Sequence, residues 1–152
     1  MTGLHLRGDE DLQRIANRLK EAGDKGLKRR VSASLRKVAR PVGERVVRKG
    51  ASGLPRRGGL SSRVASRGRV GVSNSLGGRS ASVRLLLRDG GDDLSQMDRG
   101  SLRHPVYGRK TWVRQSIRAG LFSDALAPEM PAVRRELIAA ANETLNDVAK
   151  GF

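Results

Sequence analysis

The chain has 152 residues, with 31 lysines and arginines against 15 acidic residues, and its formal net charge is +16 at pH 7. It contains no cysteine and only two histidines, which excludes disulfides, thiol catalysis and metal sites built from histidine and cysteine clusters. At this length we predict a single domain, residues 1–152, with a core of its own.

The positive charge is concentrated in one part of the chain. Residues 14–88 contain 21 lysines and arginines and three acidic residues, whereas residues 89–152 contain nine of each sign. Such an excess indicates a polyanionic partner, because cations that neutralise phosphates release counterions, although a solvated basic face is the alternative. The basic part has no aromatic residue for base stacking, so any contact with double-stranded DNA is expected at its backbone, without sequence preference.

Two helices are predicted at the start of the chain. Apolar residues recur every three or four positions from Leu12 to Ala22 and from Leu27 to Val46, which predicts helices over residues 9–23 and 25–49. Pro41 lacks an N–H group and lies inside the second pattern, so we expect a bend or a break there. The second helix is strongly basic, and the candidate contacts with DNA or another partner are Lys28, Arg29, Arg30, Arg36 and Lys37.

A sheet and a final helix are predicted after a linker. Glycine and proline predict the linker over residues 50–62, and the sheet is expected over 63–118, with an antiparallel hairpin of strands 69–73 and 82–88. Residues 111–117 fit a further strand, while residues 99–109 have no clear period. A C-terminal helix is expected over 123–149, capped by Ser123 and irregular before Pro131.

This order of elements predicts an α+β fold in which the N-terminal helices and the C-terminal helix pack on a small antiparallel sheet. We expect neither a signal peptide nor a membrane-spanning helix, because no long apolar run is present. The basic helix has an apolar face without tryptophan or phenylalanine, so we expect this face in the core rather than on a membrane.

Catalytic and metal-binding patterns are weak. His104 lies between Arg103 and Pro105 with no nucleophile at a recognisable spacing, so we interpret it as a structural or hydrogen-bonding histidine. Four acidic residues lack the ligand pattern of a calcium loop and are interpreted as a solvated turn: they are Asp89, Asp92, Asp93 and Asp98. The paired glycines match neither a phosphate-binding loop nor a dinucleotide fingerprint. We therefore predict a protein that is not an enzyme, with no metal or cofactor.

Two segments carry a resemblance to a known family. They read LPRRGGL at residues 54–60, directly after the basic helix, and GSLRHPVYGR at 100–109, followed by WVRQ at 112–115 and GLF at 120–122. Together they resemble the tail-completion or head-tail joining (neck) proteins of long-tailed double-stranded DNA phages, in the form common in phages of actinobacteria. The positions that match are Leu54, Pro55, Gly58, Gly59, Gly100, Leu102, Arg103, His104, Pro105, Tyr107, Gly108, Trp112 and Gln115.

The resemblance implies a structural virion protein. Such a protein assembles in the host cytoplasm as a ring, here expected to be hexameric, at the head-tail junction, where it joins the DNA-filled head to the tail and lets DNA pass. Its expected partners are further copies of itself, the head connector or stopper and the tail terminator. Pro105 and Gly108 would shape a loop, while Tyr107 and Trp112 would supply apolar area either to the subunit's own core or to a neighbouring subunit.

Two matters stay open from the sequence. The basic part could line the DNA channel or could contact neighbouring proteins. The second functional hypothesis, drawn from charge alone, is a sequence-independent nucleic-acid-binding protein; it leaves the motif at residues 100–115 unexplained.

Overall fold

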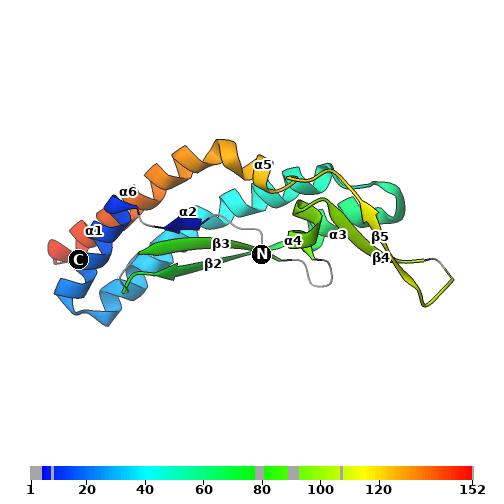
Figure 1. Ribbon diagram of the computed structural model, residues 1–152. Coiled ribbons are helices and arrows are strands. Elements are labelled where there is room, and N and C mark those ends of the chain that lie inside the picture. The colour runs from blue at the N-terminus through cyan, green and yellow to red at the C-terminus, as the bar shows by residue number, and fades with distance from the viewer. Residues whose placement is uncertain (1–4, 8, 78–80, 89–92, 107, 152) are drawn as a thin grey trace.

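The computed structural model describes residues 5–7, 9–77, 81–88, 93–106 and 108–151. Its first two helices are α1 (Glu10–Ala22) and α2 (Lys25–Ser52), as Figure 1 shows. Both predicted helices are confirmed. Of the bend or break expected at Pro41, the break is wrong, because α2 continues through this residue as one element. Pro41 is exposed, so water can reach the carbonyl group that its missing N–H would have bonded.

The segment expected as a linker is largely helical. After α2 ends at Ser52, the short 3-10 helix η1 (Arg57–Gly59) leads into α3 (Leu60–Arg67). The predicted linker over residues 50–62 and the predicted start of the sheet at residue 63 are therefore wrong. Only Leu60 and Val64 are buried in α3, and one such pair is too short a pattern to reveal a helix by its period.

The predicted hairpin is confirmed as β2 (Arg69–Ser75) and β3 (Ser82–Arg88), which pair antiparallel. A short strand, β1 (His5–Arg7), pairs with the other edge of β3 and completes a three-stranded sheet in the order β1-β3-β2. Three residues give no recognisable alternation, so the sequence did not predict β1.

A second sheet is separate from the first. After α4 (Leu94–Asp98), strand β4 (Ser101–Pro105) pairs antiparallel with β5 (Trp112–Ser116). The strand expected within residues 111–117 is confirmed as β5, and β4 lies in the segment without a clear period. Among the described residues, the strands within 63–118 thus belong to two sheets instead of the single one expected: β2 and β3 form one sheet together with β1, and β4 and β5 form the other.

The C-terminal part begins with α5 (Ser123–Leu126) and the 3-10 helix η2 (Ala127–Glu129), followed by α6 (Met130–Ala149). The helix is irregular before Pro131, as predicted. Ser123 is not the cap, however, because it is the first residue of α5 and its side chain makes no capping hydrogen bond.

Helix α2 is the central element of the fold. Figure 1 shows α6 along one side of α2 and strands β2 and β3 along the other. Two glycines of α2 allow close approach, because a Cβ on Gly43 would collide with Val70 of β2 and a Cβ on Gly50 would collide with the ring of Phe122. The buried apolar side chains form one cluster around this helix. The α+β class is confirmed, and α6 packs along α2 and contacts α1.

Candidate functional site

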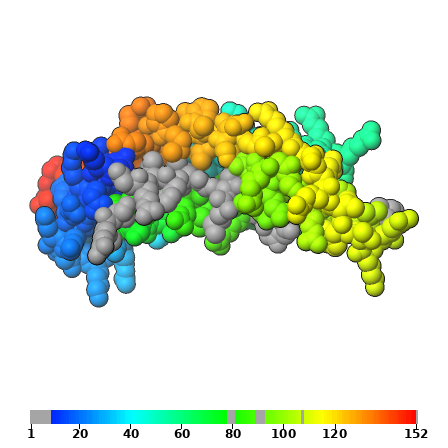
Figure 2. Space-filling model, in the orientation of Figure 1, coloured from blue at the N-terminus to red at the C-terminus, as the bar shows by residue number. Residues whose placement is uncertain are grey.

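The β4–β5 hairpin projects from one end of the molecule. Figure 2 shows it as a narrow extension of the elongated body. Its register places Pro105 opposite Trp112 and Leu102 opposite Gln115. The hairpin is closed by hydrogen bonds from the Val106 N–H to the Thr111 carbonyl oxygen and from the Arg109 N–H to the Val106 carbonyl oxygen. All five residues of β5 are exposed, so this strand presents its side chains to solvent rather than to the core.

The structure brings the two motif segments together in one groove at the base of the hairpin. The groove has a volume of about 700 Å³ and lies between the segment after α2, helix α4 and the hairpin. From the first motif it is lined by Pro55 and Gly58. From the second it is lined by Leu102, Arg103, His104, Pro105, Trp112 and Gln115. Residues some 50 positions apart in the sequence therefore form one surface, which we call the motif groove.

Trp112 is the most exposed large apolar side chain at this surface. Its exposed fraction is 55%, and that of its neighbour Val113 is 37%. The guanidinium of Arg103 lies 5.5 Å from the centre of the indole ring, within the range of a cation–π contact. Of the two roles left open for Trp112, packing in the subunit's own core is therefore wrong.

The motif glycines allow unusual backbone conformations in the segments around the groove. Gly58, Gly59, Gly100 and Gly108 all have positive φ angles, between 72° and 86°, a conformation that other residues rarely adopt. Gly108 lies in the turn of the hairpin, in keeping with the expected loop-shaping role. Leu54 is buried in the core rather than in the groove. Tyr107 lies outside the described residues.

Besides Arg103, strand β4 places two polar side chains at the groove, those of Ser101 and His104. The Nδ1 atom of His104 lies 3.2 Å from the carbonyl oxygen of Pro105, which agrees with a hydrogen-bonding rather than catalytic interpretation. The Oγ atom of Ser101 is buried and has no hydrogen-bond partner among the described residues.

Asp98 anchors the base of the hairpin to the body, a role that the sequence analysis missed. Its carboxylate accepts hydrogen bonds from the backbone N–H groups of Phe122 at 2.8 Å and Ser123 at 3.0 Å, and from the Ser123 hydroxyl. Asp98 therefore caps the start of α5 from another part of the chain. Asp93 caps α4 by accepting from the Gln96 N–H at 3.0 Å. The expected solvated turn is therefore wrong for Asp98, whereas Asp93 is exposed and also serves as a helix cap; Asp89 and Asp92 lie outside the described residues.

The predicted basic contacts lie elsewhere, on α2. Five exposed side chains form this group, and none of them lines the motif groove: they are Lys28, Arg29, Arg30, Arg36 and Lys37. The molecule thus has two separate candidate surfaces, an apolar and cationic groove at the hairpin and a basic face on the body.

Comparison with known proteins gives no relative for this chain. None of the protein-family models, curated proteins or solved structures matches it. Within the part of the chain that the structure describes, no group of three or more histidine, cysteine or acidic side chains could hold a metal ion. No helix of that part is long and apolar enough to cross a membrane.

Proposed function

We propose that this protein is a structural component of the neck of a long-tailed double-stranded DNA phage. Copies of the chain form a ring at the head-tail junction, which joins the DNA-filled head to the tail and lets DNA pass. The observation that carries the proposal is the motif groove, because the two segments that resemble neck proteins lie far apart in sequence and line one surface. If this surface docks a partner, both segments contribute to the same contact.

The chemistry of the hairpin suits docking between proteins. An exposed tryptophan stacked near an arginine combines the two residue types most enriched at the energetic centres of interfaces. Strand β5 pairs only with β4 among the described strands, which leaves its other edge open to a partner. In a closed ring each subunit contacts its neighbour through two different surfaces, so the hairpin of one copy would meet another face of the next.

The wider assignment follows the resemblance. The ring is hexameric, its neighbours are the head connector or stopper and the tail terminator, and it assembles in the host cytoplasm before it becomes part of the virion. Its role is architectural and not enzymatic. The rival hypothesis, a sequence-independent nucleic-acid-binding protein, is supported by the basic face of α2 and predicts a monomer or dimer with no place in a particle.

The test is complementation of a phage that lacks this gene with the Trp112→Ala variant. We expect DNA-filled heads and separate tails, because the exposed indole is lost from the subunit contact. The control is Lys110→Ala, which changes an exposed residue of the same hairpin outside the groove and should give joined particles. Normal yields of joined, infectious particles with Trp112→Ala would contradict the docking role of the hairpin.

A second measurement separates the neck proposal from its rival. Mass determination and negative-stain imaging of the purified protein and of phage particles should find a ring at the head-tail junction. A stable monomer that is absent from particles and retards DNA at low salt would overturn the neck proposal and favour the rival.

A further inference from the structure

A second hollow lies beside the edge strand β2, bordered by α2 and by the end of α3. It has a volume of about 380 Å³ and is lined by two arginines of α2, Arg40 and Arg48, together with Arg69 at the start of β2. Among the described residues that line this hollow, Glu44 is the only acidic one. None of these residues lines the motif groove, so this hollow is a separate surface.

The packing of α2 on the sheet explains why these arginines line the same hollow. The Ser32 hydroxyl lies 2.9 Å from the Asn74 side-chain oxygen, and Gly43 packs against Val70, so α2 runs antiparallel to β2. Residues four apart on a helix share a face. Arg40 and Arg48 are therefore held on one exposed face of α2 along the β2 edge.

The positive charge continues from the hollow onto the open face of the sheet. Arg69 lies directly opposite Arg88 in the register of β2 and β3, and Arg84 lies on the same face of β3, about 13 Å along the strand from Arg88. All three are exposed, and no described residue of β2 or β3 is acidic. Like charges directly opposite each other destabilise a sheet, so this face is built at a cost to stability.

We call Arg40, Arg48, Arg69, Arg84 and Arg88 the arginine strip. Within the described chain none of the five pairs with a carboxylate, although Arg45, Arg118 and Arg134 elsewhere in the molecule each do. Arg69 donates long hydrogen bonds to the carbonyl oxygens of Ser66 and Gly68, at 3.4 Å and 3.5 Å, so the strip offers exposed guanidinium groups that lack a carboxylate partner. A bound anion would relieve their mutual repulsion.

We propose that the arginine strip binds the phosphate backbone of double-stranded DNA. A guanidinium group matches the oxygens of a phosphate through paired hydrogen bonds. The five groups are spread along three elements, α2, β2 and β3, rather than converging on a point, which fits a line of phosphates better than a single small anion. This contact needs no aromatic residue and reads no sequence. It does not depend on ring formation or on the motif groove.

The experiment measures binding of the full chain to a fluorescent 30-base-pair duplex at several salt concentrations. The test variant carries Arg40→Gln, Arg48→Gln and Arg69→Gln. The control variant carries Lys20→Gln, Arg135→Gln and Lys150→Gln, which remove the same net charge from exposed positions on or beside α1 and α6. Circular dichroism checks that both remain folded, as expected for exposed substitutions.

We expect the test variant to bind about tenfold more weakly or worse at low salt. Its slope of log affinity against log salt should fall by about 0.9 for each lost phosphate contact. In the control variant, both the affinity at low salt and the salt slope should fall much less. Equal losses in the two variants would mean that DNA responds only to net charge, and would overturn the proposal.

A substitution at Glu44 should change the affinity for DNA in the opposite direction. Glu44→Gln removes a negative charge from the hollow and should tighten DNA binding about two- to fivefold, because repulsion of the phosphates is lost. Unchanged or weaker binding would show that DNA does not enter the hollow. A test variant that binds DNA normally but fails to assemble would assign the strip to carboxylates of a neighbouring protein, which also overturns the proposal.

Discussion

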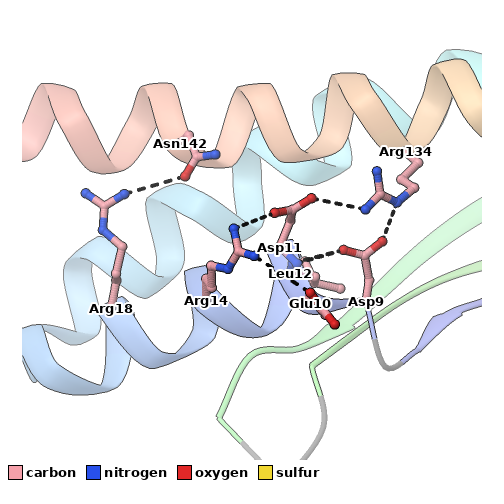
Figure 3. A network of polar contacts seen from close by, with 8 residues as sticks. All are labelled: Asp9, Glu10, Asp11, Leu12, Arg14, Arg18, Arg134 and Asn142. Carbon is pink, nitrogen blue, oxygen red and sulfur yellow. Dashed lines mark hydrogen bonds and ion pairs between the residues drawn. The ribbon is translucent and has the colours of Figure 1, made fainter.

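Arg134 of α6 donates a hydrogen bond to the carboxylate of Asp9, the residue that caps α1, although the two are 125 positions apart in the sequence (Figure 3). A second bond from Arg134 reaches Asp11 at 3.1 Å. Asp9 also accepts from the N–H groups of the first turn of α1. The Asp9 carboxylate therefore caps the N-terminus of α1 and also links this helix to α6.

The first prediction concerns the dependence of stability on pH. Burial alone would raise the pKa of Asp9, but the hydrogen bonds from Arg134, Leu12 and Asp11 outweigh it and hold this pKa below its ordinary value. A carboxyl group whose pKa is lower in the folded than in the unfolded state stabilises the fold above the unfolded pKa, about 3.9. That stabilisation is lost as the pH falls from there through the folded pKa.

Asp9→Asn should therefore be less stable than the parent near neutral pH, and this difference should shrink as the solution is acidified. Urea denaturation between about pH 6 and pH 2.5 measures it, across the range of the ordinary carboxyl pKa. Glu10→Gln is the control, because Glu10 is exposed and forms a long ion pair with Arg14, at 3.7 Å. A constant difference between Asp9→Asn and the parent across this range would contradict the role of the ionised carboxylate.

The second prediction tests the close packing of α2. Replacing glycine by alanine inside a helix ordinarily stabilises it by up to about 1 kcal/mol. At Gly50 we expect the opposite sign, a loss of about 1–3 kcal/mol of unfolding free energy, because the new methyl group would collide with the ring of Phe122. Urea denaturation measures the change.

Gly71→Ala is the matched control for Gly50→Ala. The nearest atom to a Cβ at Gly71 is the Leu86 Cβ at 3.7 Å, an ordinary contact, so we expect a change within about 0.5 kcal/mol. An increase in stability from Gly50→Ala would mean that the Phe122 ring can move aside without loss.

The regular helices and strands could be predicted from the sequence because their buried residues recur at a fixed spacing. Leu12, Ile15 and Leu19 are buried at helical spacing in α1. Val83, Leu85 and Leu87 are buried at alternate positions in β3. Each repeat is local, so a window of the sequence contains the whole signal.

The motif groove could not be derived in this way. Its shape depends on tertiary packing that brings Pro55 and Trp112 to the same groove, and no local pattern encodes that arrangement. Resemblance identified the two segments but left open whether Trp112 was core or surface. The capping role of Asp98 was not predicted for a related reason. Asp98 caps a helix that begins 25 residues later, whereas a capping pattern in the sequence involves only residues next to the start of the helix.

The third prediction follows from that cap. Asp98→Ala removes the acceptor for two backbone N–H groups at the start of α5 and should lower the unfolding free energy by about 1–2 kcal/mol, the usual cost of losing a helix cap. Amide hydrogen exchange should become faster at Phe122 and Ser123. Asp124→Ala, which removes an exposed ion pair with Arg118, should cost less than about 1 kcal/mol. Equal effects of the two variants would argue against the cap.

The fourth prediction uses the single tryptophan of the chain as a probe. Because Trp112 is 55% exposed, its fluorescence in the free protein should resemble that of indole in water and should be quenched readily by iodide. Arg103, 5.5 Å from the ring centre, attracts iodide, so Arg103→Gln should reduce this quenching more than it reduces quenching by neutral acrylamide.

Assembly of the ring should shift the Trp112 emission to shorter wavelength and protect it from both quenchers, because a neighbouring copy would cover the indole. Emission that is already blue-shifted and protected in a monomer of verified mass would contradict the exposed position of Trp112. Emission that stays unprotected in an assembled ring would leave the exposed position intact but would remove the hairpin from the subunit contact. The two failures are distinguishable because the first is measured before assembly and the second after it.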